Sequence, residues 1–229
     1  MNIEIRTTQD GSHTLYNFDL NENYHSIFGA LDESTHVFIE AGLKPVLAHK
    51  KGVFVLEIGF GTGLNAWLTA KSVNDPEALV TYITTEPHPV PVQIIDQLNY
   101  PQLLQPSSAA APSGDDELFR RIHKVAWGTT QPVTPQFHLR KLPVTVEDLK
   151  PYWFFDLVYF DAFAPNKQPD VWERPIFEKI FDITVPGGVL VTYCAKGQFK
   201  RMLKEIGWEV EALPGPTGKR EMTRAVKPV

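Results

Sequence analysis

Two apolar runs in this sequence each end in residues that can bind or react. The run "VLEIGFGTGLN" (55–65) ends in three glycines spaced two apart, and the acid Glu57 precedes them. The run "LVYFDAFAP" (157–165) leads to Asp161, which a small residue, an aromatic residue and a proline follow. Near-continuous apolar runs predict strands that are buried on both faces of a parallel sheet. Because ligands bind at the carboxyl ends of such strands, we expect the two ends to share one site.

The spacing of the glycines distinguishes between two classes of cofactor. Dinucleotide sites use G-x-G-x-x-G, whereas Gly59, Gly61 and Gly63 form G-x-G-x-G. Glycines permit positive φ and a close approach of the backbone to a ligand. The carboxylate of Glu57 would repel a pyrophosphate, but it suits S-adenosyl-L-methionine (SAM), which carries a sulfonium and an ammonium group. Glu57 and the three glycines therefore predict a SAM site.

A second acid stands at the end of the next predicted strand. "ALVTYITTE" (78–86) ends in Glu86. An acid at this point can accept hydrogen bonds from both hydroxyls of a ribose. Taken alone, Glu86 is better explained as a solvated acid in a loop. Together with Glu57 and the glycines, it favours the ribose of SAM.

Asp161 is the predicted catalytic residue. A strand beside the first one would aim this carboxylate at the methyl group of SAM, where it can hydrogen-bond an amine. A primary amine with a pKa of about 10.4 is mostly protonated at neutral pH, so an enzyme must bind the cation, remove a proton and align the lone pair. Phe163 can form a wall of the acceptor pocket, and Pro165 stiffens the exit from the strand. The alternative is an aspartate that only caps the next turn.

Composition limits the class of protein. The chain has 229 residues, of which 43% are hydrophobic and 21% charged, as in ordinary soluble globular proteins. Its single cysteine, Cys194, excludes an internal disulfide framework and a cysteine-based zinc site, and we expect no metal. The net charge of −5 argues against a broad nucleic-acid-binding surface but not against a local basic patch. Neither a signal peptide nor a membrane span is evident, so we expect a cytoplasmic protein without a membrane partner.

The order of the elements predicts an α/β fold. From residue 52 onward, strands alternate with helices, which predicts a mostly parallel sheet. The segments "WEVEALPG" and "EMTRAVK" should add one antiparallel C-terminal strand. We divide the chain into an N-terminal extension (1–50) and a catalytic domain (51–229) with an insertion at about 105–135, where 105–116 reads as a low-complexity loop.

The N-terminal extension should contain a hairpin and a helix. The hairpin is expected to turn at Asp10-Gly11 in a type I′ turn. Asp32, Ser34 or Thr35 can cap the helix, which should end before Pro45.

Three segments together resemble a known family. Residues 57–65, "FDAFAPNKQPDVW" (160–172) and "GPTGKREM" (215–222) are similar to the methyltransferase domain of the bifunctional bacterial enzyme that completes 5-methylaminomethyl-2-thiouridine in tRNA. The likeness spans nearly the whole chain, and generic SAM enzymes lack the last two segments. The resemblance implies a Rossmann-like class I SAM-dependent methyltransferase. It also implies a tRNA methyltransferase activity, in which a methyl group passes from SAM to the aminomethyl nitrogen of the wobble uridine.

The resemblance also assigns residues. It adds Asn65 to the cofactor loop, and it places Tyr24, His25 and Ser26 where the family encloses the cofactor and the acceptor. It places Lys219 and Arg220 near the acceptor site, where we expect them to contact tRNA phosphates, although charge alone favours a solvated final strand. The family tends to have a glycine-aspartate pair that addresses adenine. Here Thr145 stands in place of that aspartate, so the expected adenine contacts are Thr145, Val146 and Glu147.

The implied partner is a tRNA with an aminomethyl-modified wobble uridine. The bifunctional enzyme also carries an FAD-dependent oxidase domain. Because this chain ends at Val229, we expect the stand-alone form, without FAD and with a functional link to a separate oxidase.

Two alternatives to this function stay open. One is a small-molecule amine enzyme, because "DAFAP" also resembles aminopropyl-transferring polyamine synthases, although the several acids of their diamine site are not evident. The other is a non-catalytic partner module with the same fold.

Overall fold

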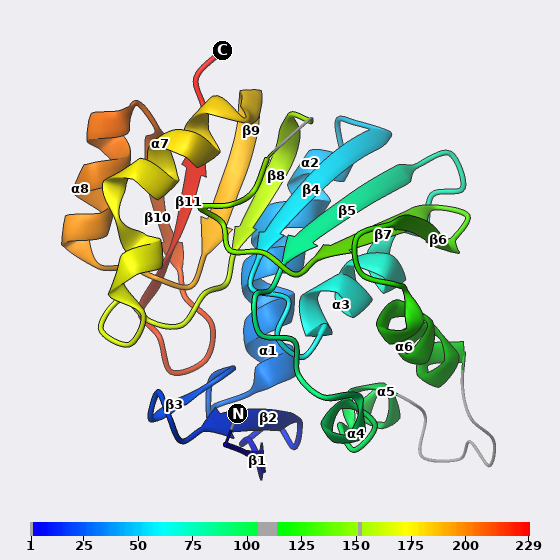
Figure 1. The fold of residues 1–229 in the computed structure, drawn as a ribbon. Helices are drawn as coiled ribbons and strands as arrows, with labels where there is room; N and C mark the ends of the chain where they lie inside the picture. The colour runs from blue at the N-terminus through cyan, green and yellow to red at the C-terminus, as the bar shows by residue number, and fades with distance from the viewer. Residues whose placement is uncertain (1, 105–113, 151–152) are drawn as a thin grey trace.

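An eight-stranded sheet forms the centre of the molecule (Figure 1). The computed structural model describes residues 2–104, 114–150 and 153–229. The sheet has the strand order β10-β11-β9-β8-β4-β5-β7-β6. The strands are β4 (Gly52–Ile58), β5 (Leu79–Thr85), β6 (Thr130–Thr134), β7 (Phe137–Leu142), β8 (Phe155–Phe160), β9 (Thr184–Thr192), β10 (Glu209–Pro214) and β11 (Glu221–Val226). This α/β arrangement confirms the predicted fold class.

The sheet contains two antiparallel strands rather than the one predicted. β4, β5, β7, β8 and β9 pair in parallel, and β11 lies antiparallel between β9 and β10, as expected. β6 adds a further antiparallel strand at the other edge, next to β7. Its sequence contains Pro132, at a register shift of the β6–β7 pairing, and proline is tolerated only in such edge positions. That proline hid the strand from sequence reasoning.

Two apolar layers hold the helices on the sheet. β8 is buried along its whole length, so Tyr159 and Phe160 point to opposite faces. On one face, Tyr159 packs against Phe38, and Trp67 of α3 (Leu64–Ser72) joins the same core. On the other face, Phe160 contacts Phe177 of α7 (Arg174–Asp182), which in turn contacts α8 (Gly197–Ile206). This packing fixes the ends of β4 and β8 side by side.

Three further helices follow β5 in the chain. They are α4 (Val92–Ile95), α5 (Tyr100–Leu103) and α6 (Gly114–Lys124). α6 packs against α3 through Phe119 and Trp67. Of the predicted low-complexity loop, residues 105–113 lie outside the described residues. The limits of the predicted insertion stay a prediction.

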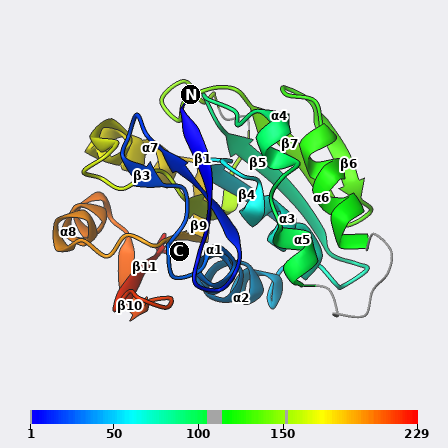
Figure 2. The ribbon, with the colours of Figure 1, turned by 90° about the horizontal axis from the view of Figure 1, so that it is seen from below.

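A small antiparallel sheet covers one end of the large one (Figures 1 and 2). It consists of β1 (Ile3–Thr7), β2 (His13–Asn17) and β3 (Glu22–Asn23). The predicted hairpin is confirmed, but its type I′ turn is wrong. Such a turn needs positive φ at two residues, and here only Gly11 has it. The Asp10 carboxylate instead accepts hydrogen bonds from the Ser12 N–H and the Thr8 hydroxyl, which fixes a longer loop.

The helix of the extension is longer than predicted. α1 (Ala30–Ser34), the π-helix η1 (Thr35–Leu43) and α2 (Lys44–Leu47) follow one another without a break. The predicted caps therefore lie inside the helical segment, which begins after Gly29. Pro45 does not end it, because the helical segment continues from the π-helix through α2, in which Pro45 is the second residue. In the described part of the chain, no helix has the length and apolar character needed to cross a membrane.

Candidate active site

The loop between β4 and α3 brings the two predicted strand ends together. Its glycines all have positive φ: +93° at Gly59, +47° at Gly61 and +73° at Gly63. A Cβ atom at Gly59 would lie 2.7 Å from the backbone oxygen of Asp161. Only glycine combines this conformation with this close approach. The loops after β4 and β8 are therefore in direct contact, as the sequence predicted.

Glu86 is held against the glycine loop by backbone donors. The Gly61 N–H donates to its Oε2 atom at 3.1 Å, and the His88 N–H donates to its Oε1 atom at 2.8 Å. Burial raises the pKa of Glu86, while these two hydrogen bonds act against that rise. Each carboxylate oxygen can accept a second hydrogen bond. The side chain is thus fixed at the cavity wall with acceptor capacity left over.

A cavity of about 660 Å³ lies at these strand ends. Of the predicted site residues, its lining includes Tyr24, His25, Gly59, Gly61, Glu86, Thr145, Val146, Glu147, Asp161 and Phe163. The lining does not include Glu57, Gly63, Asn65, Ser26, Pro165, Lys219 or Arg220. Further lining residues that sequence reasoning missed include Asn17, Asp19, Gln168 and Asp170. Five carboxylates thus face one cavity, which suits a cationic ligand such as SAM.

Glu57 lies behind the cavity wall. Its side chain is fully buried in β4, and neither carboxylate oxygen has a hydrogen-bond partner of standard geometry among the described residues. Burial raises its pKa to about 8, and the charge of Asp161 acts in the same direction, against the polar groups of Thr84, Tyr82 and Asn65. Glu57 is therefore mostly neutral at pH 7, which differs from the charged carboxylate that the sequence analysis matched to a cationic ligand.

Asp161 is poised to exchange a proton near neutral pH. Burial raises its pKa to about 7, and the charge of Glu33 adds to this, while the Asn65 hydrogen bond and Lys219 oppose it. The Asn65 amide donates to Oδ2 of Asp161 at 2.8 Å. Since Asn65 is in the first turn of α3, it ties the carboxylate to the end of the glycine loop. An amine at this carboxylate would meet a fixed, ionisable acceptor.

The N-terminal extension closes over the glycine loop. The Tyr24 ring contacts Phe163 edge-on at 4.9 Å between centroids, and a Cβ atom at Gly61 would lie 3.2 Å from Tyr24. His25 Nε2 lies 2.9 Å from the hydroxyl of Thr62, inside the loop. Burial lowers the pKa of His25 to about 4, so the ring is neutral. His25 therefore anchors the loop, in addition to lining the cavity.

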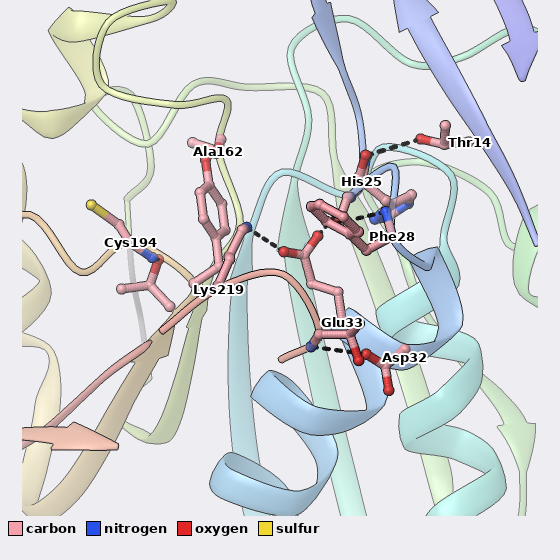
Figure 3. Close-up of polar contacts among 12 residues, drawn as sticks. Thr14, His25, Phe28, Asp32, Glu33, Ala162, Cys194 and Lys219 are labelled. Atoms are coloured by element: carbon pink, nitrogen blue, oxygen red, sulfur yellow. Dashed lines mark hydrogen bonds and ion pairs between the residues drawn. The ribbon is translucent and has the colours of Figure 1, made fainter. Parts of the chain in front are cut away.

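An ion pair joins the extension to the C-terminal motif (Figure 3). Buried Glu33 accepts a hydrogen bond from the Ser26 N–H at 2.8 Å and pairs with the Lys219 ammonium. That ammonium lies 4.1 Å from the ring centroid of Tyr193, whose hydroxyl donates to the Ala162 carbonyl at 2.8 Å. Lys219 is thus paired inside the protein, whereas Arg220 is exposed, and their contact with tRNA stays a prediction.

Sequence reasoning missed this connection because its partners are far apart in the chain. "LDEST" around Glu33 indicated only a helix cap, and Tyr193 stands in an apolar strand.

A lysine of α7 holds the loop after β7 in place. Lys179 donates to the carbonyls of Val146 at 3.0 Å and Glu147 at 2.7 Å. The Thr145 hydroxyl donates to Asp148 at 3.2 Å. This loop contributes Thr145, Val146 and Glu147 to the cavity lining, and Val146 is buried. No cluster of three or more potential metal ligands occurs among the residues that the structure describes.

The fold and a family match show which class of protein the chain resembles. Residues 137–228 match the family described as S-adenosyl-L-methionine-dependent methyltransferase. The sheet, with its antiparallel β11 between β9 and β10, is that of class I SAM-dependent methyltransferases. SAM is the cofactor of this class, as the glycine loop predicted.

Within this class, the chain is similar to one part of a bifunctional protein. It is 31% identical over 209 residues to the tRNA 5-methylaminomethyl-2-thiouridine biosynthesis bifunctional protein MnmC of Cupriavidus necator. The match covers 88% of this chain and 31% of that relative, so the chain spans about a third of its length. The predicted resemblance to the methyltransferase part is confirmed.

Two solved structures show the same fold. MnmC2 from Aquifex aeolicus has a TM-score of 0.76 at 24% identity, over 100% of this chain and 73% of that one. Spermidine synthase from Thermotoga maritima has a TM-score of 0.54 at 11% identity, over 99% of this chain and 72% of that one. At these identities both comparisons bear on the fold alone.

Proposed function

We propose that this protein uses SAM to methylate the aminomethyl nitrogen of a modified uridine at the wobble position of tRNA, giving 5-methylaminomethyl-(2-thio)uridine. The observation that carries the proposal is Asp161, held by Asn65 at an acidic cavity with a pKa of about 7. Such a group can hold an ammonium and accept its proton. The bifunctional relatives, named for the biosynthesis of this nucleoside, support the choice of acceptor.

The cofactor would occupy the cavity in one orientation. Its ribose hydroxyls would donate to Glu86, and its adenine would lie against Thr145, Val146 and Glu147. Gly59 and Gly61 leave the backbone open beside its amino-acid portion, where the acidic lining favours a cation. When bound, SAM supplies an electrophilic methyl group on a sulfonium.

The chain's own residues would prepare the amine for attack. Asp161 would bind the ammonium form, accept one proton and leave the nitrogen lone pair free. The Asn65 amide keeps the carboxylate in place throughout. Tyr24 and Phe163, in edge contact, would exclude water and orient the aminomethyl arm.

The extension and the C-terminal motif would form the acceptor side. We assign residues 1–50 to an extension that contributes Tyr24, His25 and Ser26 to this side, and 51–229 to the catalytic domain with its insertion at about 105–135. Lys219 would shape the acceptor wall through Glu33 and Tyr193. A tRNA substrate would place the protein in the cytoplasm, where a separate oxidase or another enzyme must supply the free aminomethyl group.

A small-amine enzyme is the second candidate. The five carboxylates of the cavity favour it, because polyamine sites also gather acids around a cation. Purified protein incubated with SAM should methylate aminomethyl tRNA but not spermidine or putrescine, as nucleoside and amine mass spectrometry can show. Transfer to the polyamines alone would support the second candidate. Failure to bind SAM in a calorimetric titration would support a non-catalytic module.

A further inference from the structure

A second hollow lies directly beside the proposed acceptor site. It measures about 450 Å³, and its lining includes Pro165 and Pro169. The neighbouring Gln168, Asp170 and Val171 line the cofactor cavity instead. The two cavities share no lining residue, so the segment 165–172 that follows Asp161 forms the partition between them. A molecule bound in this hollow would lie next to the group that Asp161 holds.

The hollow is basic, whereas the cavity behind it is acidic. Arg174, Lys196 and Arg201 line it, with Glu205 as its only acid. Arg174 is engaged by Glu205 and by Glu178. Lys196 and Arg201 are exposed, and within the described residues neither forms an ion pair. Two unpaired cations thus face this space in a protein whose net charge is −5.

The start of helix α8 also favours an anion in this hollow. Lys196 directly precedes the ten-residue helix α8, and no side chain caps this helix start. The free N–H groups of a first helical turn favour an anion, and they act here beside two cationic side chains. Lys219, the earlier candidate for a phosphate contact, already pairs with Glu33.

We infer that this hollow binds a backbone phosphate of the RNA that carries the methylated nucleotide, through Lys196 and Arg201. The inference rests on the proposed function, since it names the subsite that holds the flanking phosphodiester. Guanidinium and ammonium groups suit this ligand, because they donate hydrogen bonds and neutralise its charge. The arrangement explains how an acidic protein docks a polyanion: one basic subsite stands next to an acidic pocket that accepts only the cationic arm.

The test compares Arg201→Ala, Lys196→Ala and the double variant with a matched control, Lys204→Ala. Lys204 is exposed on the same helix but does not line the hollow. Methyl transfer to aminomethyl tRNA is measured at several salt concentrations, with SAM affinity and the unfolding temperature as checks. We expect the double variant to raise KM for tRNA about tenfold. Each lost contact should reduce the slope of log(kcat/KM) against log salt by about 1. SAM affinity and the control should remain parental.

A second substrate separates the subsite from the chemistry. The nucleoside 5-aminomethyluridine lacks phosphate, so the parent and all three variants of the hollow should methylate it at equal rates. The inference is overturned if the double variant has the parent's KM for tRNA and the parent's salt slope. It is also overturned if Lys204→Ala raises KM for tRNA equally, or if the double variant methylates the nucleoside as poorly as it methylates tRNA.

If the parent methylates neither substrate, the proposed function fails. The inference is then decided by fluorescence anisotropy with an RNA hairpin. In that measurement, the double variant must bind the RNA hairpin more weakly than the parent and with a smaller salt slope. Binding equal to that of the parent would overturn the inference.

Discussion

Asp161 acts in this account as an acceptor of one proton, so the pH dependence of methyl transfer tests it. Its pKa of about 7 means that the carboxylate is ionised above that pH and protonated below it. The single-turnover rate should therefore rise with pH through about 7. Asp161→Asn should keep SAM binding and lose a factor of about 10²–10⁴ at neutral pH. It should recover part of the rate as pH approaches the amine pKa of about 10.4.

The measurement is single-turnover methylation of aminomethyl tRNA from about pH 6.5 to 9.5, spanning the range below that amine value. If Asp161→Asn keeps near-parental rates over this range, Asp161 has no role in proton transfer and serves only as a strand-end cap.

Glu86 carries the prediction for cofactor affinity. Glu86→Ala removes a charged acceptor of ribose hydroxyls and the partner of the Gly61 N–H, so SAM binding should weaken by about 1.5–3 kcal/mol. Glu209→Ala is a suitable control, because this exposed acid lies in β10 and does not line the cavity. Calorimetric titration gives both affinities. Equal affinity of Glu86→Ala and the parent would exclude the ribose role.

At the scale of elements, the contact between the loops after β4 and β8 predicts an intolerant position. Gly59→Ala places a Cβ atom 2.7 Å from the Asp161 carbonyl at a φ of +93°. The strain should cost about 1–3 kcal/mol and weaken SAM binding, because both loops must shift. Gly52→Ala, at the start of the same strand, meets nothing within 4 Å and should behave like the parent. Thermal unfolding and SAM titration measure both effects, and parental values for Gly59→Ala would contradict the loop contact.

The ion pair between the extension and the C-terminal motif should adjust Asp161. Lys219 lowers the pKa of Asp161 and Glu33 raises it. Lys219→Met should therefore move the pH profile of methyl transfer upward, and Glu33→Gln should move it downward. The unfolding temperature identifies any general loss of structure. Shifts of both variants in the same direction would contradict the electrostatic role.

Local patterns explain which elements were predictable. The runs before Gly59 and Asp161 predicted their strands because burial on both faces leaves few polar residues. The same reasoning placed two strand ends at one cavity. It failed at Pro45, where the helical segment passes from a π-helix into α2 and continues to Leu47. It missed the Glu33–Lys219 pair because a contact across nearly the whole chain leaves no periodic signal.

At the scale of the whole molecule, buried ionisable groups predict how stability depends on pH. The pKa of Glu57 rises from 4.5 to about 8 on folding, so the folded state binds its proton more tightly. The contribution of Glu57 to stability should therefore fall as pH rises from about 5 to 8. Glu57→Gln should flatten this decline, because glutamine does not titrate. Thermal unfolding without SAM at intervals over this range would show it, and parallel curves for variant and parent would contradict a buried, neutral Glu57.

The distribution of charge over the molecule fits the proposed substrate. The cavity gathers five carboxylates for a cationic cofactor and amine, and the hollow beyond segment 165–172 gathers three cations. The net charge of the chain revealed neither the acidic cavity nor the basic hollow, because it sums the charges of both. The account therefore predicts that raising salt weakens tRNA methylation strongly and leaves SAM binding nearly unchanged.

The most direct test of the central claim is nucleoside mass spectrometry after a single incubation. The protein, SAM and tRNA that carries 5-aminomethyl-2-thiouridine are combined, and the tRNA is digested to nucleosides. With the parent protein and SAM, the aminomethyl nucleoside should gain one methyl group on its amine. With Asp161→Asn, only a trace of the methylated nucleoside should form. A protein that binds SAM but leaves this nucleoside unchanged would contradict it.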